Sequence, residues 1–93
     1  MTKVTINYLG QLEQFAGRPS DTREFRARIR LPDLLAELAG HYGEDFRRMV
    51  MDEAGRPRAS LLIVMNGEAI NRASDPEFKD GDEVTLLPPI AGG

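Results

Sequence analysis

A chain of 93 residues with a formal net charge of −3 has the length of one domain and is too short for two hydrophobic cores. It contains no cysteine, which excludes disulfides, thiolate zinc sites and a cysteine nucleophile. The mild acidity argues against nonspecific nucleic-acid binding, and no apolar run has the length of a signal peptide or a membrane span. We therefore expect a cytoplasmic protein with neither nucleic acid nor membrane as a partner.

The first 17 residues change from strand-like to helix-like spacing. At the start, apolar residues occupy every second position, the period of a half-buried strand: Val4, Ile6 and Tyr8. Gly10 then opens, and Gly17 closes, a segment with apolar residues at helical spacing: Leu12, Phe15 and Ala16. These patterns predict one strand followed by one short helix.

A second strand is predicted after a turn at residues 18–21. In this strand alternate residues would face inward (Phe25, Ala27 and Ile29), and the residues between them are arginines (Arg26, Arg28 and Arg30). With Arg23, these arginines could serve an RNA-binding strand. Because that face lacks aromatic residues, the arginines are better explained as charges that protect an exposed sheet edge from aggregation.

The strongest helix signal covers residues 31–42. Its apolar residues form one continuous stripe: Leu31, Leu34, Leu35, Leu38 and Tyr42. Pro32 suits the first helical position, Asp33 lies near the positive end of the helix dipole, and Gly43 is a typical stop. A further helical turn is expected just beyond, from the apolar residues Phe46, Met49 and Val50.

The second half of the chain predicts strands joined by turns. A polar loop at residues 52–58 precedes an apolar run of strand length, residues 61–65. Asn66-Gly67 is the preferred pair for a tight hairpin turn, and a return strand follows through Ile70. After a turn at residues 80–82, the last strand should place alternate residues toward the core (Val84, Leu86) and away from it (Thr85, Leu87).

These elements together predict an α+β fold of the β-grasp, or ubiquitin-like, type. One main helix would pack across a mixed sheet of four to five strands and bury every apolar stripe in a single core. The last strand should lie centrally beside the first. Residues 1–87 would form this single domain, and residues 88–93 a flexible C-terminal Gly-Gly tail that leaves from a rigid strand.

The tail differs in composition from an ordinary polar chain end. Its residues in order are Pro88, Pro89, Ile90, Ala91, Gly92 and Gly93. The prolines keep the backbone extended and so reduce the entropy lost on entering a pocket, and the glycines let the backbone thread a narrow channel. The Gly93 carboxylate would need activation: its attack on the α-phosphate of ATP gives an acyl-adenylate, from which a sulfur donor displaces AMP and leaves a thiocarboxylate.

Residues 80–93, DGDEVTLLPPIAGG, resemble the terminal signature of the MoaD/ThiS family of ubiquitin-like sulfur carriers. Residues 9–17 resemble the short helix after the first strand in the molybdopterin-synthase small subunit, and residues 65–68 resemble the family hairpin. The resemblance implies that Gly93 is adenylated by a ubiquitin-activating-type enzyme using Mg-ATP and becomes a thiocarboxylate. A sulfurtransferase and a sulfur-accepting synthase large subunit would be further partners. The chain itself would bind no cofactor or metal and carry no catalytic side chain.

Leu9 and Leu87 fall on the outward parity of their strands, where polar residues are the rule. If the first and last strands are neighbours, these leucines form an apolar patch near the exit of the tail. In the family that the chain resembles, apolar residues at these places contact the activating enzyme. Single exposed leucines are also common in proteins without any such role.

Three polar residues, His41, Asp80 and Asp82, could be metal ligands or catalytic groups, but a structural role explains each of them more simply. His41 lies near the end of the main helix, where a cationic ring is mildly favoured, and a lone histidine cannot build a metal site. Asp80 and Asp82 flank a turn glycine without further ligands at metal spacing. We expect all three to be structural.

Several functions stay open at this point. The molybdopterin branch is favoured, while carriers for cysteine or thiamine biosynthesis and protein modifiers conjugated through Gly93 share the adenylated intermediate. A plain β-grasp binding module with an incidental tail is an alternative of a different class, because a Gly-Gly end arises by chance in about half a percent of chains at ~7% glycine.

Overall fold

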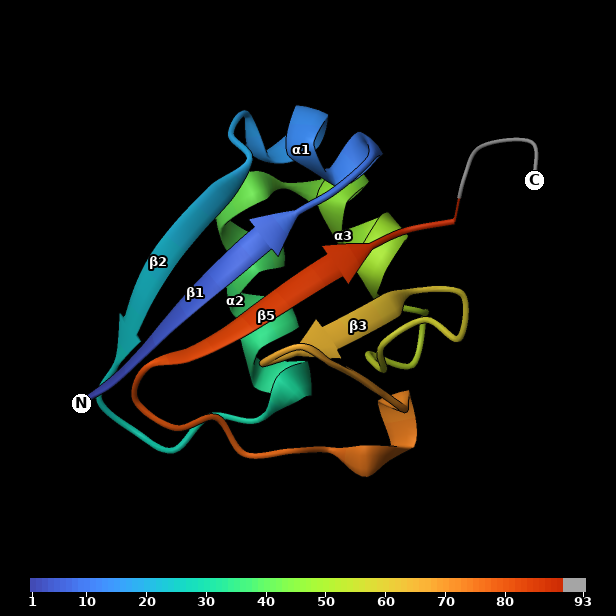
Figure 1. Ribbon diagram of the computed structural model, residues 1–93. Coiled ribbons are helices and arrows are strands. Elements are labelled where there is room, and N and C mark those ends of the chain that lie inside the picture. The colour runs from blue at the N-terminus through green and yellow to red at the C-terminus, as the bar shows by residue number, and fades with distance from the viewer. Residues whose placement is uncertain (90–93) are drawn as a thin grey trace.

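A five-stranded mixed sheet organises the computed structural model, which describes residues 1–89 apart from the side chain of Arg72 (Figure 1). The strands are β1 (Thr2–Tyr8), β2 (Ser20–Phe25), β3 (Leu62–Met65), β4 (Glu68–Ile70) and β5 (Asp82–Leu87), in the spatial order β2-β1-β5-β3-β4. β1 and β5 are parallel, whereas the other neighbouring pairs are antiparallel. The last strand therefore lies centrally beside the first, as the sequence predicts.

The helices cover one face of this sheet. α2 (Leu31–Tyr42) crosses behind the strands, and the shorter α1 (Gln11–Ala16) and α3 (Glu44–Val50) lie near the ends of β1 and β5 (Figure 1). A single 3-10 turn, η1 (Arg72–Ser74), lies in the connection between β4 and β5. Within residues 1–89 no helix is long and apolar enough to cross a membrane.

The core forms where the apolar stripe of α2 meets the inward face of the sheet. The four leucines of the stripe are buried, together with inward residues of three strands: Val4, Ile6, Ile63, Val84 and Leu86. Each such side chain contributes ~1.5–3 kcal/mol of burial free energy. The ends of α2 also follow the prediction: the Arg30 N–H donates to Asp33 Oδ2 at 3.1 Å, and the helix stops at Gly43, which has a φ of 104°.

The hairpin between β3 and β4 turns at Asn66 and Gly67, with φ values of 52° and 87°. Positive φ at both central residues is the signature of a tight turn whose twist matches the strands, so the predicted hairpin is confirmed. The Asn66 side chain ties this turn to β5. Its Nδ2 donates to Asp82 Oδ1 at 3.0 Å, and its Oδ1 accepts from the Glu83 N–H at 2.9 Å.

The predicted position of the second strand is wrong by several residues. β2 begins at Ser20, inside the predicted turn, and ends at Phe25, so Arg26, Arg28 and Arg30 lie outside it. The β1–β2 ladder ends where Thr2, the first residue of β1, pairs with Phe25. Ile29 is buried as expected, but Ala27 is exposed.

Candidate functional site

The end of β5 is the point from which the tail begins. The Leu9 N–H donates to the Leu86 carbonyl oxygen at 3.1 Å, which fastens the chain after β1 to the end of β5. Pro88 follows directly and is buried, whereas Pro89 is exposed. The other predicted tail residues, including the Gly93 carboxylate, lie outside the described part of the chain: Ile90, Ala91, Gly92 and Gly93.

Both leucines predicted to contact a partner lie at this exit. Leu9 is 42% exposed, and Leu87 is half-buried on the face of the sheet that the helices leave uncovered. A β-carbon built on Gly10 would lie 3.7 Å from Leu87 Cδ1, so the turn after β1 lies against the Leu87 side chain. The predicted juxtaposition of the two segments is therefore present.

A third leucine belongs to the same surface and was not predicted from the sequence. Leu62 is 46% exposed and pairs directly with Leu87 across the antiparallel β3–β5 ladder. The signal lay in the period of two within residues 61–65: because Leu61 and Ile63 point inward, Leu62 must point outward. We refer to Leu9, Leu62 and Leu87 as the exit patch.

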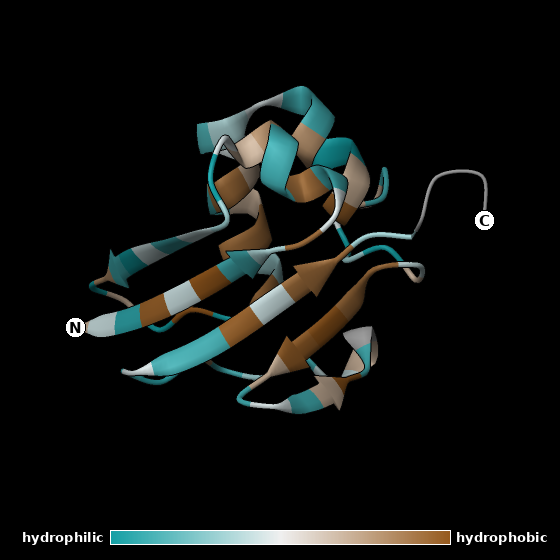
Figure 2. Cartoon of the chain, turned by 45° about the horizontal axis from the view of Figure 1, so that its top comes forward, coloured by the Kyte–Doolittle hydropathy of each residue, from teal (hydrophilic) through white to brown (hydrophobic). Residues whose placement is uncertain are grey.

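On β1 and β5, the outward residues away from the exit are polar. The Asn7 side-chain amide donates to Glu83 Oε2 at 2.8 Å and to Thr85 Oγ1 at 3.1 Å, so these outward residues of β1 and β5 satisfy one another. In Figure 2, β5 begins hydrophilic and ends hydrophobic. On β1 and β5, the outward apolar residues are therefore confined to the end from which the tail departs.

A charged cluster lies at the same end of the sheet, on its helical face. Asp21 Oδ2 accepts a hydrogen bond from the Tyr42 hydroxyl at 2.8 Å and one from Arg23 Nε at 3.2 Å. Burial raises the pKa of the Asp21 carboxyl, but the Tyr42 hydroxyl, the Thr22 N–H and the nearby arginines outweigh burial and hold it below its ordinary value. The pKa of Tyr8, next to Tyr42, is raised chiefly by burial. The cluster keeps Asp21 ionised and tied to its neighbours, which is a structural role.

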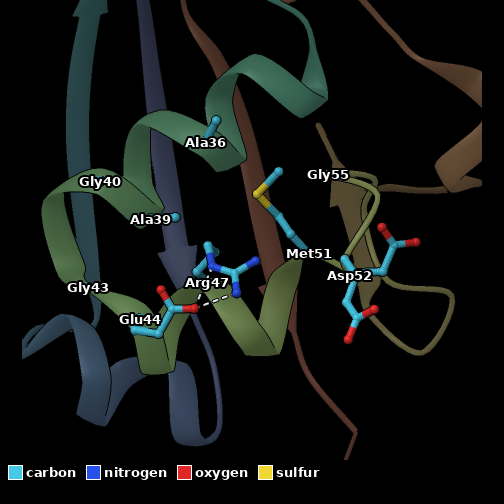
Figure 3. A pocket seen from close by; sticks show the side chains of 10 residues that line it. Ala36, Ala39, Gly40, Gly43, Glu44, Arg47, Met51, Asp52 and Gly55 are labelled. Atoms are coloured by element: carbon cyan, nitrogen blue, oxygen red, sulfur yellow. Dashed lines mark hydrogen bonds and ion pairs between the residues drawn. The ribbon is translucent and has the colours of Figure 1, made fainter.

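A groove of about 510 Å³ opens on the helical layer, lined by small residues of α2, by α3 and by the following loop (Figure 3). Two of its charged members face each other: Arg47 Nε donates to Glu44 Oε1 at 2.7 Å, and this contact lowers the pKa of the Glu44 carboxyl. None of the residues that line the groove belongs to the exit patch or to the sheet. We assign no chemistry to this groove, because its ion pair is already satisfied within the chain.

The remaining polar candidates make local contacts. Asp82 Oδ2 accepts from the Lys79 N–H at 2.7 Å, as expected for a residue that shapes a turn, whereas Asp80 Oδ1 accepts from the Lys3 N–H at 2.8 Å and so ties the turn to β1. His41 is exposed and stacks edge-on against Tyr42 with ring centroids 4.7 Å apart. No group of three or more potential ligand residues that could hold a metal occurs within residues 1–89.

Of the arginines predicted to lie on an edge strand, the structure places some inside that strand and others outside it. β2 is an edge strand, but of these arginines it contains only Arg23, which pairs with Asp21. Arg28 lies 4.0 Å from Glu77, and Arg30 lies 3.7 Å from Asp75 and 3.8 Å from Glu77. They are part of the contact between the segment before α2 and the segment before β5.

Comparison with known proteins gives a consistent result. The model of the ThiS family matches residues 6–93. The molybdopterin synthase sulfur carrier subunit of Drosophila melanogaster is 27% identical over 94 residues, covering 100% of this chain and 93% of that protein. The chain is thus similar to these proteins along its whole length.

Solved structures agree with this match. A Pyrococcus furiosus protein described as molybdopterin converting factor, subunit 1, is 29% identical, with a TM-score of 0.76 over 97% of this chain and 100% of that one. The small archaeal modifier protein 1 of Methanosarcina acetivorans has a TM-score of 0.80 at 24% identity, over 100% of this chain and 98% of that one. The second likeness concerns the fold alone, and it supports the β-grasp assignment.

Proposed function

This chain belongs to the ThiS family of ubiquitin-like sulfur carriers, and from that premise we propose that Gly93 carries sulfur as a C-terminal thiocarboxylate. The sulfur would be delivered in the biosynthesis of a cofactor, with molybdopterin favoured because the sulfur carrier subunit of molybdopterin synthase is similar over the full chain. Members of this family are small carrier subunits, and the catalytic side chains would lie in the partner proteins.

One observation carries the proposal: the central strand β5 delivers the tail beside an exposed apolar patch. Strand pairing on both sides fixes β5, so its end is a firm anchor. The exit patch provides apolar area that a partner can cover, and the polar outward residues of β1 and β5 limit where that partner docks. A surface of this kind suits a protein that is held by one enzyme and then by another.

The chemistry requires two successive steps at the Gly93 carboxylate. One carboxylate oxygen attacks the α-phosphate of ATP and expels pyrophosphate, which gives an acyl-adenylate. If the nucleophile is hydrosulfide, its attack on the carbonyl carbon expels AMP and gives the thiocarboxylate directly. If it is an enzyme-bound persulfide, loss of AMP leaves an acyl disulfide, and a second thiol then cleaves that disulfide to release the thiocarboxylate. The nucleotide, its Mg²⁺ and the sulfur donor would be bound by an adenylating enzyme and a sulfurtransferase, in the cytoplasm where ATP is available.

The protein modifier is the second candidate, because the chain has the same fold as an archaeal modifier protein. A modifier uses the same adenylate but transfers Gly93 to lysine side chains. Isopeptide-linked adducts in cell extracts would favour the modifier, and a free thiocarboxylate would favour the carrier. Carriers for cysteine or thiamine biosynthesis differ from the molybdopterin carrier only in the acceptor, which reconstitution with each synthase distinguishes.

ATP–pyrophosphate exchange with the cognate activating enzyme tests the first step. The full chain should support exchange, whereas a chain that ends at Ala91 should not support it. The shortened chain should still bind the enzyme, since the exit patch is intact. If neither chain supports exchange, the tail is incidental and the plain binding module is the correct reading; if both support it, adenylation does not require the Gly-Gly end.

A further inference from the structure

The turn between β1 and α1 contains a backbone conformation that L-amino acids rarely adopt. Gly10 has a φ of 60° and a ψ of −138°, and the absence of a β-carbon makes this conformation accessible. The turn sends the chain from β1 directly into α1, where the Leu12 N–H donates to the Leu9 carbonyl oxygen at 3.2 Å. Glycine is needed at position 10 to fold the chain back over the end of the sheet.

This turn lies against the first residue of the tail. A β-carbon built on Gly10 would lie 3.7 Å from Pro88 Cγ, 3.8 Å from Pro88 Cδ and 3.7 Å from Leu87 Cδ1. These are ordinary packing distances, so the proline ring faces the turn without a clash. Pro88 is buried although it lies beyond the last residue of β5, whereas Pro89 is exposed.

Pro88 also ends the pairing of β5. The Leu9 N–H is bonded to the Leu86 carbonyl oxygen, and Pro88 has no N–H with which to extend a ladder. The ring occupies the place where a further ladder bond would form, and its fixed φ sets the direction of the next peptide. The two prolines therefore differ in role: Pro88 is packed against the fold, and Pro89 is the first exposed residue of the tail.

We propose that Gly10 and Pro88 form an exit point that sets the position and direction in which the tail leaves the domain, with Gly10 as a positioning residue for the reaction at Gly93. This inference rests on the proposed function. The exit point shortens the free tail to residues 89–93, which can span at most ~18 Å when extended. With so short a reach, the direction of departure decides whether Gly93 arrives at a nucleotide bound by a docked enzyme.

Two matched pairs of variants test the exit point in ATP–pyrophosphate exchange. Pro88→Ala and Pro89→Ala remove the same backbone restriction, but only Pro88→Ala removes a packed ring. Gly10→Ala and Gly17→Ala both place a side chain at positive φ, and only Gly10 lies against the tail. Because Gly17 is in the left-handed αL region (ψ 11°) and Gly10 is not (ψ −138°), the unfolding midpoint of each variant is measured beside its kcat, and a loss of kcat counts only where the variant is folded. Pro88→Val, which restores apolar packing against the turn but neither the fixed φ nor the missing N–H, is the rescue variant for the packed ring.

The exit point predicts about a tenfold lower kcat for Pro88→Ala and Gly10→Ala, the scale expected from a small misplacement of the reacting group. Pro89→Ala and Gly17→Ala should lose less than about threefold, Pro88→Val should recover most of the loss, and the Kd for the enzyme should stay within about twofold of wild type because the exit patch is retained. Equal losses within each pair, or a change confined to Kd, would overturn the proposal.

A second measurement does not depend on activity. In the NMR spectrum of the full chain, the Pro88 ring protons should show nuclear Overhauser contacts to the Gly10 α-protons, and Pro89 should show none. Absence of the Pro88 contacts overturns the exit point whatever the exchange assay gives. A wild-type chain that shows these contacts but supports no exchange would instead contradict the proposed function and leave the exit point intact.

Discussion

The two ends of the β1–β5 strand pair are built differently, although they share one sheet and one solvent-facing side. At the beginning of β5 the residues are polar and tied to neighbouring segments, with Asp80 bound to the Lys3 N–H and Asn66 bound to Asp82 and Glu83. At the other end the outward residues are leucines that no helix covers. The polar end stabilises the turns, whereas the apolar end leaves uncovered the surface at which we propose that a partner docks.

This difference separates stability from function along a single pair of strands. Changes at the polar end should alter the free energy of unfolding and leave partner binding unaffected. Changes at the exit patch should weaken partner binding and leave the free energy of unfolding nearly unchanged, because exposed leucines contribute little to the folded core. Each prediction that follows tests this separation, beginning with the largest expected effect.

Leu62→Asp should weaken binding to the activating enzyme by about 30-fold or more, the loss of ~2 kcal/mol typical of an anchor residue. The charge would have to lose its water when the partner covers the exit patch. Because Leu62 is 46% exposed, the unfolding midpoint should change little. Titration calorimetry measures the first quantity and urea denaturation the second.

Thr22→Asp is the matched control, since Thr22 is exposed on the same face of the edge strand β2. It should change the Kd by less than about threefold, because it lies outside the anchor region. Equal weakening by both variants would mean that overall charge, and not the exit patch, governs binding.

Asp21→Asn should change the pH dependence of stability and leave binding unchanged, because Asp21 lies on the helical face. The folded-state pKa of Asp21 is held below its ordinary value of 3.8, so the ionised form stabilises the fold above that pH and the contribution is lost as the pH falls through the folded value. The wild type should exceed the variant in stability at pH 7, and the gap should narrow below pH ~4. A gap that stays constant or widens in acid would show that this carboxylate is not stabilising.

Asn7→Ala removes two side-chain hydrogen bonds in the polar middle of the same face. We expect a loss of ~1 kcal/mol in the free energy of unfolding, since both acceptors remain accessible to water. The Kd for the enzyme should be unchanged. A large loss of binding would extend the docking surface along β1 and remove the contrast between the two ends.

The smallest effect is expected at the far polar end. Lys3 and Glu24 lie 3.9 Å apart with side chains that are 58% and 49% exposed, so Lys3→Ala should cost less than ~0.5 kcal/mol. Thermal denaturation at low and high salt measures this change. A larger loss would show that the polar end is held together more by ion pairs than by its backbone hydrogen bonds.

The fold can be predicted from the sequence wherever apolar period and turn chemistry agree. The stripe of α2, the Asn66-Gly67 turn and the parity of β5 are local patterns, and all of them appear in the structure. The residue at which β2 ends cannot be predicted from a local pattern, because it depends on where its partner strand β1 begins. Alternating arginines imitate a strand in residues 26–30, although no partner strand is available there.

The site is predictable in part for the same reason. Leu9 and Leu87 follow from strand parity, and Leu62 would have followed from the same rule applied to residues 61–65. The packing of Pro88 against Gly10 joins positions far apart in the sequence, and no local pattern indicates it. The link between Asp21 and Tyr42 is of the same kind, since it depends on how α2 crosses β2.

Intact-mass spectrometry is the most direct test of the central claim, that the Gly93 carboxylate carries sulfur. The full chain would be incubated with its activating enzyme, Mg-ATP, a sulfurtransferase and a sulfur source, and then digested to locate any change. The account predicts a mass gain equal to the exchange of one oxygen for one sulfur, confined to the peptide that ends in Gly93. An unchanged mass in a mixture that converts another carrier of the family would contradict it, as would a native protein that continues beyond Gly93 without processing.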